Sequence, residues 1–211
     1  MATQAIGLDC YPYCASSTVL AASRAAIASK VLVSWSKPHP ELNGMDLAEV
    51  AKKLGCSQTE AIARLLPAGA IYFAMDENDV QRILAFEKTM IGSDGLPHDA
   101  APHPRLWGTF PRVLGHYCRE LGLFPLETAV HKMSGLAAQT FGLPGRGVLR
   151  AGAHADITIF DAARVAEEAT FQQPIQPAAG IDTVIVNGAI VWRAGRATGA
   201  RPGQRLRRSA T

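Results

Sequence analysis

The order of apolar runs and amphipathic segments along the chain is the feature that most constrains its fold. Runs suited to buried strands alternate with segments that have helical spacing, and the last seventy or so residues hold β-hairpins instead. The hairpin signal is Asn187-Gly188 between the apolar runs 182–186 and 189–192, because this dipeptide favours a two-residue hairpin turn. The pattern therefore predicts α/β material followed by a small β appendage.

The length of the α/β part limits what it can be. A complete eight-stranded α/β barrel needs about 250 residues, whereas the β appendage begins here after residue 145. We therefore predict three regions: a partial (β/α) barrel over 1–145, a small β domain over 146–200 and a basic tail over 201–211.

Local signals predict individual elements. Capping pairs, Asp46 with Glu49 and Ser57 with Glu60, predict two short helices. Apolar residues at helical spacing predict a helix over 106–121 with a break or a restart at Pro111. The hydroxyl-rich segment 15–18 is expected to be a loop, and 147–150 is expected to be a strand.

Charge and composition favour some classes of partner over others. The net charge is +3, and Arg201, Arg205, Arg207 and Arg208 lie near the end of the chain. No aromatic residues lie between these arginines, so a solvated end is favoured over a nucleic-acid or membrane contact. No apolar run reaches the roughly 18 residues of a membrane helix. The four cysteines form no C-x-x-C pair, and we expect free thiols in a cytoplasmic protein.

Asp94 is the leading candidate for chemistry. It follows the apolar run 89–91 and precedes Gly95. Enzymes of the α/β class place catalytic carboxylates at the ends of strands, where a glycine lets the backbone turn away. Asp94 can then act as a metal ligand or a general base. The alternative is an Asx turn, in which the carboxylate bonds nearby amides.

Other polar residues lie at the same expected edge. Tyr11 and Ser17 follow the first strand, where two hydroxyls can hold a substrate carboxylate, and the alternative is a polar loop. Met75 ends an apolar run and either lines a pocket or packs in the core. The loop histidines His98 and His103 could bind a metal or simply make the loop polar. No H-x-H or H-E-x-x-H motif is present.

Several blocks of this sequence resemble the D-aminoacylases, the N-acyl-D-amino-acid deacylases of the amidohydrolase superfamily. The specific blocks are Ile91-Gly-Ser-Asp-Gly-Leu-Pro-His98 and His103-Pro-Arg-Leu-Trp-Gly-Thr-Phe-Pro-Arg-Val-Leu-Gly115, and Leu8-Asp-Cys-Tyr-Pro-Tyr13 adds to them. The resemblance covers nearly the whole chain and corresponds to the C-terminal half of such an enzyme. The Gly152-x-x-Ala-Asp156 and Val186-Asn-Gly188 motifs support only the superfamily.

The resemblance implies a fold, a reaction and residue roles. It implies a zinc-bearing α/β barrel with a small β domain that hydrolyses the linear amide of N-acyl-D-amino acids. Asp94 matches the metal-binding carboxylate that takes a proton from the metal-held water and passes it to the leaving nitrogen. Tyr11 and Ser17 match positions that hold the substrate carboxylate, and Met75 matches a position lining the acyl or side-chain pocket.

The resemblance also implies that this chain holds only one of the family's zinc ligands. The family's other metal ligands are an H-x-H pair, a cysteine and two further histidines, and all of them lie upstream of the segment that matches Leu8. Catalytic zinc normally takes three protein ligands. Three hypotheses follow: a half that acts with a complementary N-terminal half, an inactive truncated remnant, or another amidohydrolase of the dihydroorotase or isoaspartyl-dipeptidase type. We expect the chain alone to show neither stoichiometric zinc nor turnover.

Overall fold

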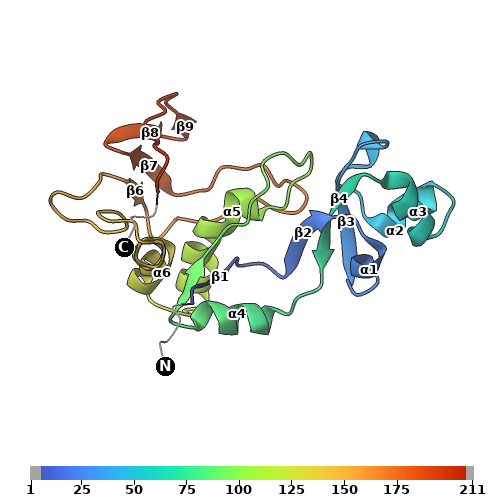
Figure 1. Ribbon diagram of the computed structural model, residues 1–211, viewed down its shortest axis with the longest axis horizontal. Helices are drawn as coiled ribbons and strands as arrows, with labels where there is room; N and C mark the ends of the chain where they lie inside the picture. The colour runs from blue at the N-terminus through green and yellow to red at the C-terminus, as the bar shows by residue number, and fades with distance from the viewer. Residues whose placement is uncertain (1–5, 208–211) are drawn as a thin grey trace.

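The computed structural model describes residues 6–207, which form a mixed α/β structure of elongated shape (Figure 1). One group of elements surrounds a parallel strand pair and comprises β1 (Leu8–Cys10), α4 (Glu77–Ala85), β5 (Thr89–Ile91), α5 (Arg105–Arg112), η2 (Val113–Glu120), α6 (Leu126–Met133) and α7 (Gly135–Phe141). An insertion between β1 and β5 comprises β2 (Ala15–Val19), α1 (Ala22–Ala25), β3 (Lys30–Ser36), η1 (Pro40–Leu42), α2 (Leu47–Lys53), α3 (Gln58–Leu65) and β4 (Ala68–Phe73). The last group is β6 (Ile157–Phe160), β7 (Ile181–Val186), β8 (Ala189–Arg193) and β9 (Arg196–Ala197). The mixed α/β class agrees with the prediction from sequence.

β1 and β5 are the central strands of the first group. They pair in parallel, with Leu8 opposite Thr89 and Cys10 opposite Ile91. Helices α4, η2 and α6 pack around them, and buried side chains such as Leu84, Val113 and Tyr117 form a shared core with β5. The carboxyl ends of the two strands therefore lie side by side.

The insertion (residues 15–73) is an antiparallel unit with its own core. Its strand order is β2-β4-β3, and the buried faces of α2 and α3 join β3 and β4 in one apolar cluster. The expected loop at 15–18 is wrong, because this segment forms β2 and pairs with β4. Ala15 and Ser17 are buried at alternate positions of that strand, which explains the register despite the hydroxyl-rich composition.

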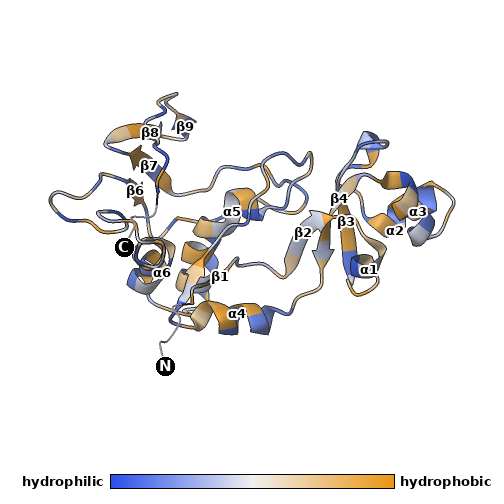
Figure 2. Cartoon of the chain, viewed as in Figure 1, coloured by the Kyte–Doolittle hydropathy of each residue, from blue (hydrophilic) through white to orange (hydrophobic). Residues whose placement is uncertain are grey.

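The helix starts in the insertion follow the sequence signals. Ser57 and Glu60 form a reciprocal capping box at the start of α3, as predicted. Asp46 caps α2 by accepting a hydrogen bond from the Ala48 amide. Figure 2 shows polar and apolar residues on different sides of α3 and α4, as amphipathic helices require.

The helix predicted over 106–121 continues through Pro111 rather than breaking there. Pro111 lies inside α5, and the chain runs on without interruption into η2, a π-helix. Proline supplies no amide hydrogen, so one backbone bond of the ladder is missing at this point. The following residues use wider hydrogen bonds, such as the one from the Leu121 amide to the His116 carbonyl at 2.9 Å.

The C-terminal sheet is antiparallel in the order β6-β7-β8-β9. Asn187 and Gly188 join β7 to β8 with φ angles of 46° and 81°, which confirms the predicted hairpin and its turn. The strand expected at 147–150 is wrong, because Gly147 has φ 71° and the segment is irregular.

No helix within residues 6–207 is long and apolar enough to cross a membrane.

Candidate active site

The carboxyl ends of β1 and β5 carry the two leading candidates from sequence. Tyr11 directly follows β1, and Asp94 lies three residues after β5. Pairing extends past the strands, since the Gly92 amide donates to the Cys10 carbonyl at 3.1 Å. A side chain at position 92 would place its Cβ 2.4 Å from the Asp9 carboxylate. Glycine at 92 therefore leaves room for the Asp9 side chain beside the end of β5.

Asp94 forms an ion pair with Arg105, a residue that sequence reasoning did not single out as a site residue. Asp94 Oδ2 lies 2.8 Å from Arg105 Nη2, and the side chains are 64% and 2% exposed respectively. Asp94 has φ 46°, a left-handed conformation that turns the chain sharply after the strand. The carboxylate is thus open to solvent on one side and held by a buried cation on the other.

Arg105 brings three segments together. Its Nη2 also donates to the Ser17 carbonyl at 3.3 Å, and its guanidinium lies over the Tyr11 ring at 4.5 Å. Burial raises the pKa of Tyr11, although the adjacent Arg105 charge opposes this change. Tyr11, Ser17 and Asp94, predicted from separate parts of the sequence, therefore meet around one guanidinium.

Two polar atoms of this cluster have no hydrogen-bond partner among the described residues. They are Arg105 Nη1 and Ser17 Oγ, and both are buried. A buried donor without a partner costs roughly 1–3 kcal/mol. These atoms are consequently candidates for binding a polar group of a ligand once it enters.

The imidazole of His103 is neutral, and it holds the backbone of Arg105 in place. Its Nδ1 accepts a hydrogen bond from the Arg105 amide at 3.0 Å, so Nε2 carries the hydrogen and donates to the Ala15 carbonyl at 3.0 Å. Burial, reinforced by the Arg105 charge, lowers the pKa of His103 to about 3. Because both ring nitrogens are occupied, His103 is not available as a metal ligand.

The other sequence candidates lie away from this cluster. Met75 is 42% exposed in the segment between β4 and α4, and its amide donates to the Cys14 carbonyl at 3.2 Å. The described contacts of Arg105 do not include Met75. The ring of His98 is 72% exposed, and its Nε2 lies 3.7 Å from the buried Asp99 carboxylate.

The described side chains are not grouped in a way that fits a zinc site. Within residues 6–207 no group of three or more His, Cys, Asp or Glu side chains is arranged to hold a metal ion. The sequences of residues 1–5 and 208–211 contain none of these residue types. Catalytic zinc normally takes three protein ligands, and Asp94 offers one carboxylate that already pairs with Arg105.

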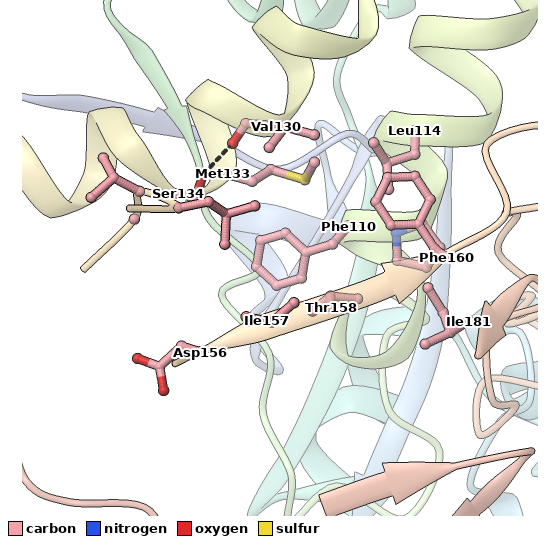
Figure 3. A pocket seen from close by; sticks show the side chains of 14 residues that line it. Phe110, Leu114, Val130, Met133, Ser134, Asp156, Ile157, Thr158, Phe160 and Ile181 are labelled. Carbon is pink, nitrogen blue, oxygen red and sulfur yellow. Dashed lines mark hydrogen bonds between the residues drawn. The ribbon is translucent and has the colours of Figure 1, made fainter. Parts of the chain in front are cut away.

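A separate apolar cavity of about 610 Å³ lies between α5, α6 and β6 (Figure 3). Its lining includes Phe110, Val130, Met133, Ile157 and Phe160. None of Tyr11, Ser17, Met75 and Asp94 lines it. The polar cluster at the strand ends, rather than this cavity, therefore holds the groups suited to catalysis.

Comparison with known proteins gives a consistent family. The model of the amidohydrolase family matches residues 4–192. The chain is 60% identical over 210 residues to D-aminoacylase from Alcaligenes xylosoxydans xylosoxydans, covering 100% of this chain and 43% of the relative. It is 55% identical to the N-acyl-D-aspartate deacylase of the same organism, covering 97% of this chain and 41% of that protein.

Solved structures agree with the sequence relatives. A crystal structure of D-aminoacylase superposes with a TM-score of 0.90 at 60% identity, over 94% of this chain and 42% of the other. An N-acyl-D-glutamate deacylase from Bordetella bronchiseptica, solved with zinc and a phosphonate inhibitor, superposes with a TM-score of 0.90 at 52% identity, over 94% of this chain and 42% of the other. The chain thus spans less than half the length of these relatives. With the family model matching most of its residues, the chain belongs to the amidohydrolase family.

Proposed function

We propose that this chain supplies the carboxylate-bearing part of the active site of an N-acyl-D-amino-acid deacylase. Such an enzyme hydrolyses the linear amide to a carboxylate and a free D-amino acid. The observation that carries the proposal is the exposed Asp94 carboxylate beside the buried Arg105, whose Nη1 has no partner among the described residues. The names of the relatives, deacylases of N-acyl-D-amino acids, supply the substrate class.

Each residue has a distinct part in this proposal. Asp94 takes a proton from the attacking water and delivers it to the leaving nitrogen, a role that suits an exposed carboxylate held in place on one side. Arg105 Nη1 binds the substrate carboxylate together with the hydroxyls of Tyr11 and Ser17. Met75 lines the pocket for the acyl group or the side chain of the substrate, and a methionine there favours apolar over acidic side chains.

The rest of the site comes, in this proposal, from a complementary segment corresponding to the N-terminal half of the relatives. The zinc implied by the family would have to be bound by ligands of that segment, since this chain offers too few. The pairing of β1 with β5 supports the proposal that a complementary segment adds further strands. β1 and β5 form a two-stranded parallel sheet among the described strands, and parallel strands normally belong to larger sheets with several neighbours.

Complementation tests the proposal. The chain would be co-expressed with the part of the Alcaligenes D-aminoacylase that precedes the matched region, and hydrolysis of N-acetyl-D-methionine and its L-enantiomer would be followed. We expect D-selective hydrolysis by the complex, a loss of at least about 100-fold in Asp94→Asn, and full activity in Asp79→Asn. Asp79 is a matched control, because it is an exposed aspartate paired with a helical arginine, Arg82.

Two results would contradict the proposal. One is a stable complex without D-selective hydrolysis. The other is a complex whose activity is unchanged by Asp94→Asn.

A further inference from the structure

The segment between β6 and β7 forms an arm that leaves the C-terminal sheet and reaches the insertion (Figure 1, orange). We define the arm as residues 162–179. Its base is closed by two hydrogen bonds between Ala166 and Ala179, at 3.4 and 3.0 Å. At its tip the Thr170 amide donates to the Gln173 carbonyl at 3.1 Å, and the Gln173 amide donates to Thr170 Oγ1 at 2.9 Å. This turn presents Phe171.

One side of the continuous helix α5–η2 is shaped to hold the first half of the arm. Glycines permit close approach: a Cβ at Gly115 would lie 2.8 Å from the Val165 carbonyl oxygen, and a Cβ at Gly108 would lie 3.2 Å from Glu167 Cβ. Arg112 lies between these two glycines in the sequence, and Arg119 lies four residues beyond Gly115. The first half of the arm is therefore in direct contact with the helix α5–η2.

Two arginines fasten the arm to the same helix. Arg119 Nη1 donates to the carbonyl oxygens of Val165 at 2.6 Å and Ala162 at 3.2 Å. Arg112 Nη1 lies 2.5 Å from Glu167 Oε1, and both side chains are largely buried. The Glu167 carboxylate raises the pKa of Arg112, opposing the effect of burial. The arm is thus fixed at several points before it reaches its tip.

The tip contacts three segments that meet at the candidate site. The Phe171 ring centroid lies 4.7 Å from that of Phe73, 5.0 Å from that of His103 and 6.4 Å from that of Tyr13. Phe73 ends β4 and is opposite Ala15 of β2, the strand that carries Ser17. His103 supports the Arg105 backbone. Phe171 therefore lies between the insertion and the segment that holds Arg105.

We propose that the arm is a clamp that sets the orientation of the insertion relative to the Asp94–Arg105 pair, with Phe171 as its positioning residue. The insertion leaves the first group of elements through two short connections. Among the described residues, the polar contacts that secure it there include the bonds from His103 to the Ala15 carbonyl, from Arg105 to the Ser17 carbonyl and from Ala101 to the Ser34 carbonyl. The aromatic contacts of Phe171 add an apolar support on the same side. That the clamp places Ser17 near a substrate rests on the proposed function. That it orients the insertion does not.

Residual dipolar couplings of backbone amides in the isolated chain test this proposal, because they report how two rigid parts are oriented. In the wild type we expect one alignment tensor to fit both the insertion and the first group of elements, which holds the Asp94–Arg105 pair. In Phe171→Ala the insertion should need a tensor of its own, with magnitude reduced by at least about twofold through averaging over orientations. Phe171→Tyr, which keeps the ring, should restore the single tensor. Phe141→Ala is the matched control, since Phe141 is 57% exposed at the end of α7.

A single unchanged tensor in Phe171→Ala would overturn the clamp. If that variant does not fold, Glu167→Gln decides, because it weakens the anchor without emptying the aromatic cluster: a separate tensor supports the proposal and a shared one refutes it. The measurement uses no substrate, so a failure of the deacylase proposal leaves its outcome unaffected.

Discussion

At the residue scale, the Asp94–Arg105 pair is unequal in burial, and this governs how the chain should respond to mutation. Arg105 is 2% exposed and bonds to two segments, while Asp94 is 64% exposed. Removing the exposed partner lets water approach the guanidinium, whereas removing the buried partner empties the space that three segments share.

We therefore expect unequal losses of stability when the two partners are replaced. Asp94→Asn should lower the free energy of unfolding by less than about 1 kcal/mol. Arg105→Ala should lower it by about 2–4 kcal/mol, because a buried side chain is lost together with its bonds. Urea denaturation followed by circular dichroism measures both values. Equal losses in the two variants would show that the pair is not held in the arrangement described.

His103 gives a pH dependence whose sign follows from its lowered pKa. The folded protein holds the imidazole neutral down to about pH 3, while the unfolded chain protonates it near pH 6.5. Protonation of the unfolded state is therefore favoured between these values. The contribution of His103 to stability is fully present above about pH 6.5 and is lost as the pH falls towards 3, by up to about 1.4 kcal/mol per pH unit.

The variant His103→Asn isolates this effect. Asparagine can accept the bond from the Arg105 amide in place of Nδ1 but does not titrate. We expect its free energy of unfolding to depend less steeply on pH between 6.5 and 4 than that of the wild type. Parallel slopes for wild type and His103→Asn would contradict the buried neutral ring.

At the scale of elements, residues with special backbone angles determine where strands begin and end. Asn187 has φ 46° and fixes the β7–β8 turn, and its side chain accepts a bond from Arg146 Nη2 at 2.9 Å and donates to the Pro202 carbonyl at 2.8 Å. The Asn187 amide also donates to Asp156 Oδ1 at 2.8 Å. The turn therefore joins the hairpin to the segment before β6.

Two substitutions separate the conformation of Asn187 from its bonds. Asn187→Gly keeps the left-handed angle and loses the side-chain bonds, and it should cost about 1 kcal/mol of stability. Asn187→Ala loses the bonds and also strains the backbone, adding roughly 1 kcal/mol. Thermal denaturation of the two variants gives the difference. If alanine is tolerated as well as glycine, the left-handed angle carries no cost at this turn.

The sequence predicted the elements whose signals are local. The Ser57–Glu60 capping box and the Asn187-Gly188 hairpin formed as predicted, because each depends on residues within one turn of chain. The strand at 15–19 was missed because its hydroxyl-rich composition gives no hydrophobic run. Its register comes from pairing with β4, more than fifty residues later in the chain.

At the scale of the whole molecule, the candidate site was predictable only in part, for the same reason. The position of Asp94 after a strand is visible in the sequence. The grouping of Tyr11, Ser17 and Asp94 around Arg105 depends on contacts between residues 11–17 and residues 94–105, which are far apart in the sequence. Nothing local to Arg105 indicates which residues its guanidinium contacts. The roles of Tyr11, Ser17 and Met75 remain predictions.

The zinc content of the purified chain depends on the molecule as a whole. We expect the purified chain, after equilibration with zinc and removal of free ion, to retain well below one zinc per chain, because a single carboxylate paired with Arg105 cannot replace three ligands. Atomic emission spectrometry gives the ratio, with Asp94→Asn as the comparison. A ratio near one in the wild type that falls in Asp94→Asn would show a zinc site in this chain alone.

The pairing of Ala15 with Phe73, at the two ends of the insertion, has a consequence for the order in which the chain folds. β1 and β5 are separated by roughly eighty residues, and closing so long a loop directly is slow. Once the insertion has folded on its own core, its ends are adjacent, and the loop left to close shrinks to the short connections on either side. We therefore expect the insertion to form before β1 pairs with β5, and its formation to bring Tyr11 and Asp94 closer together.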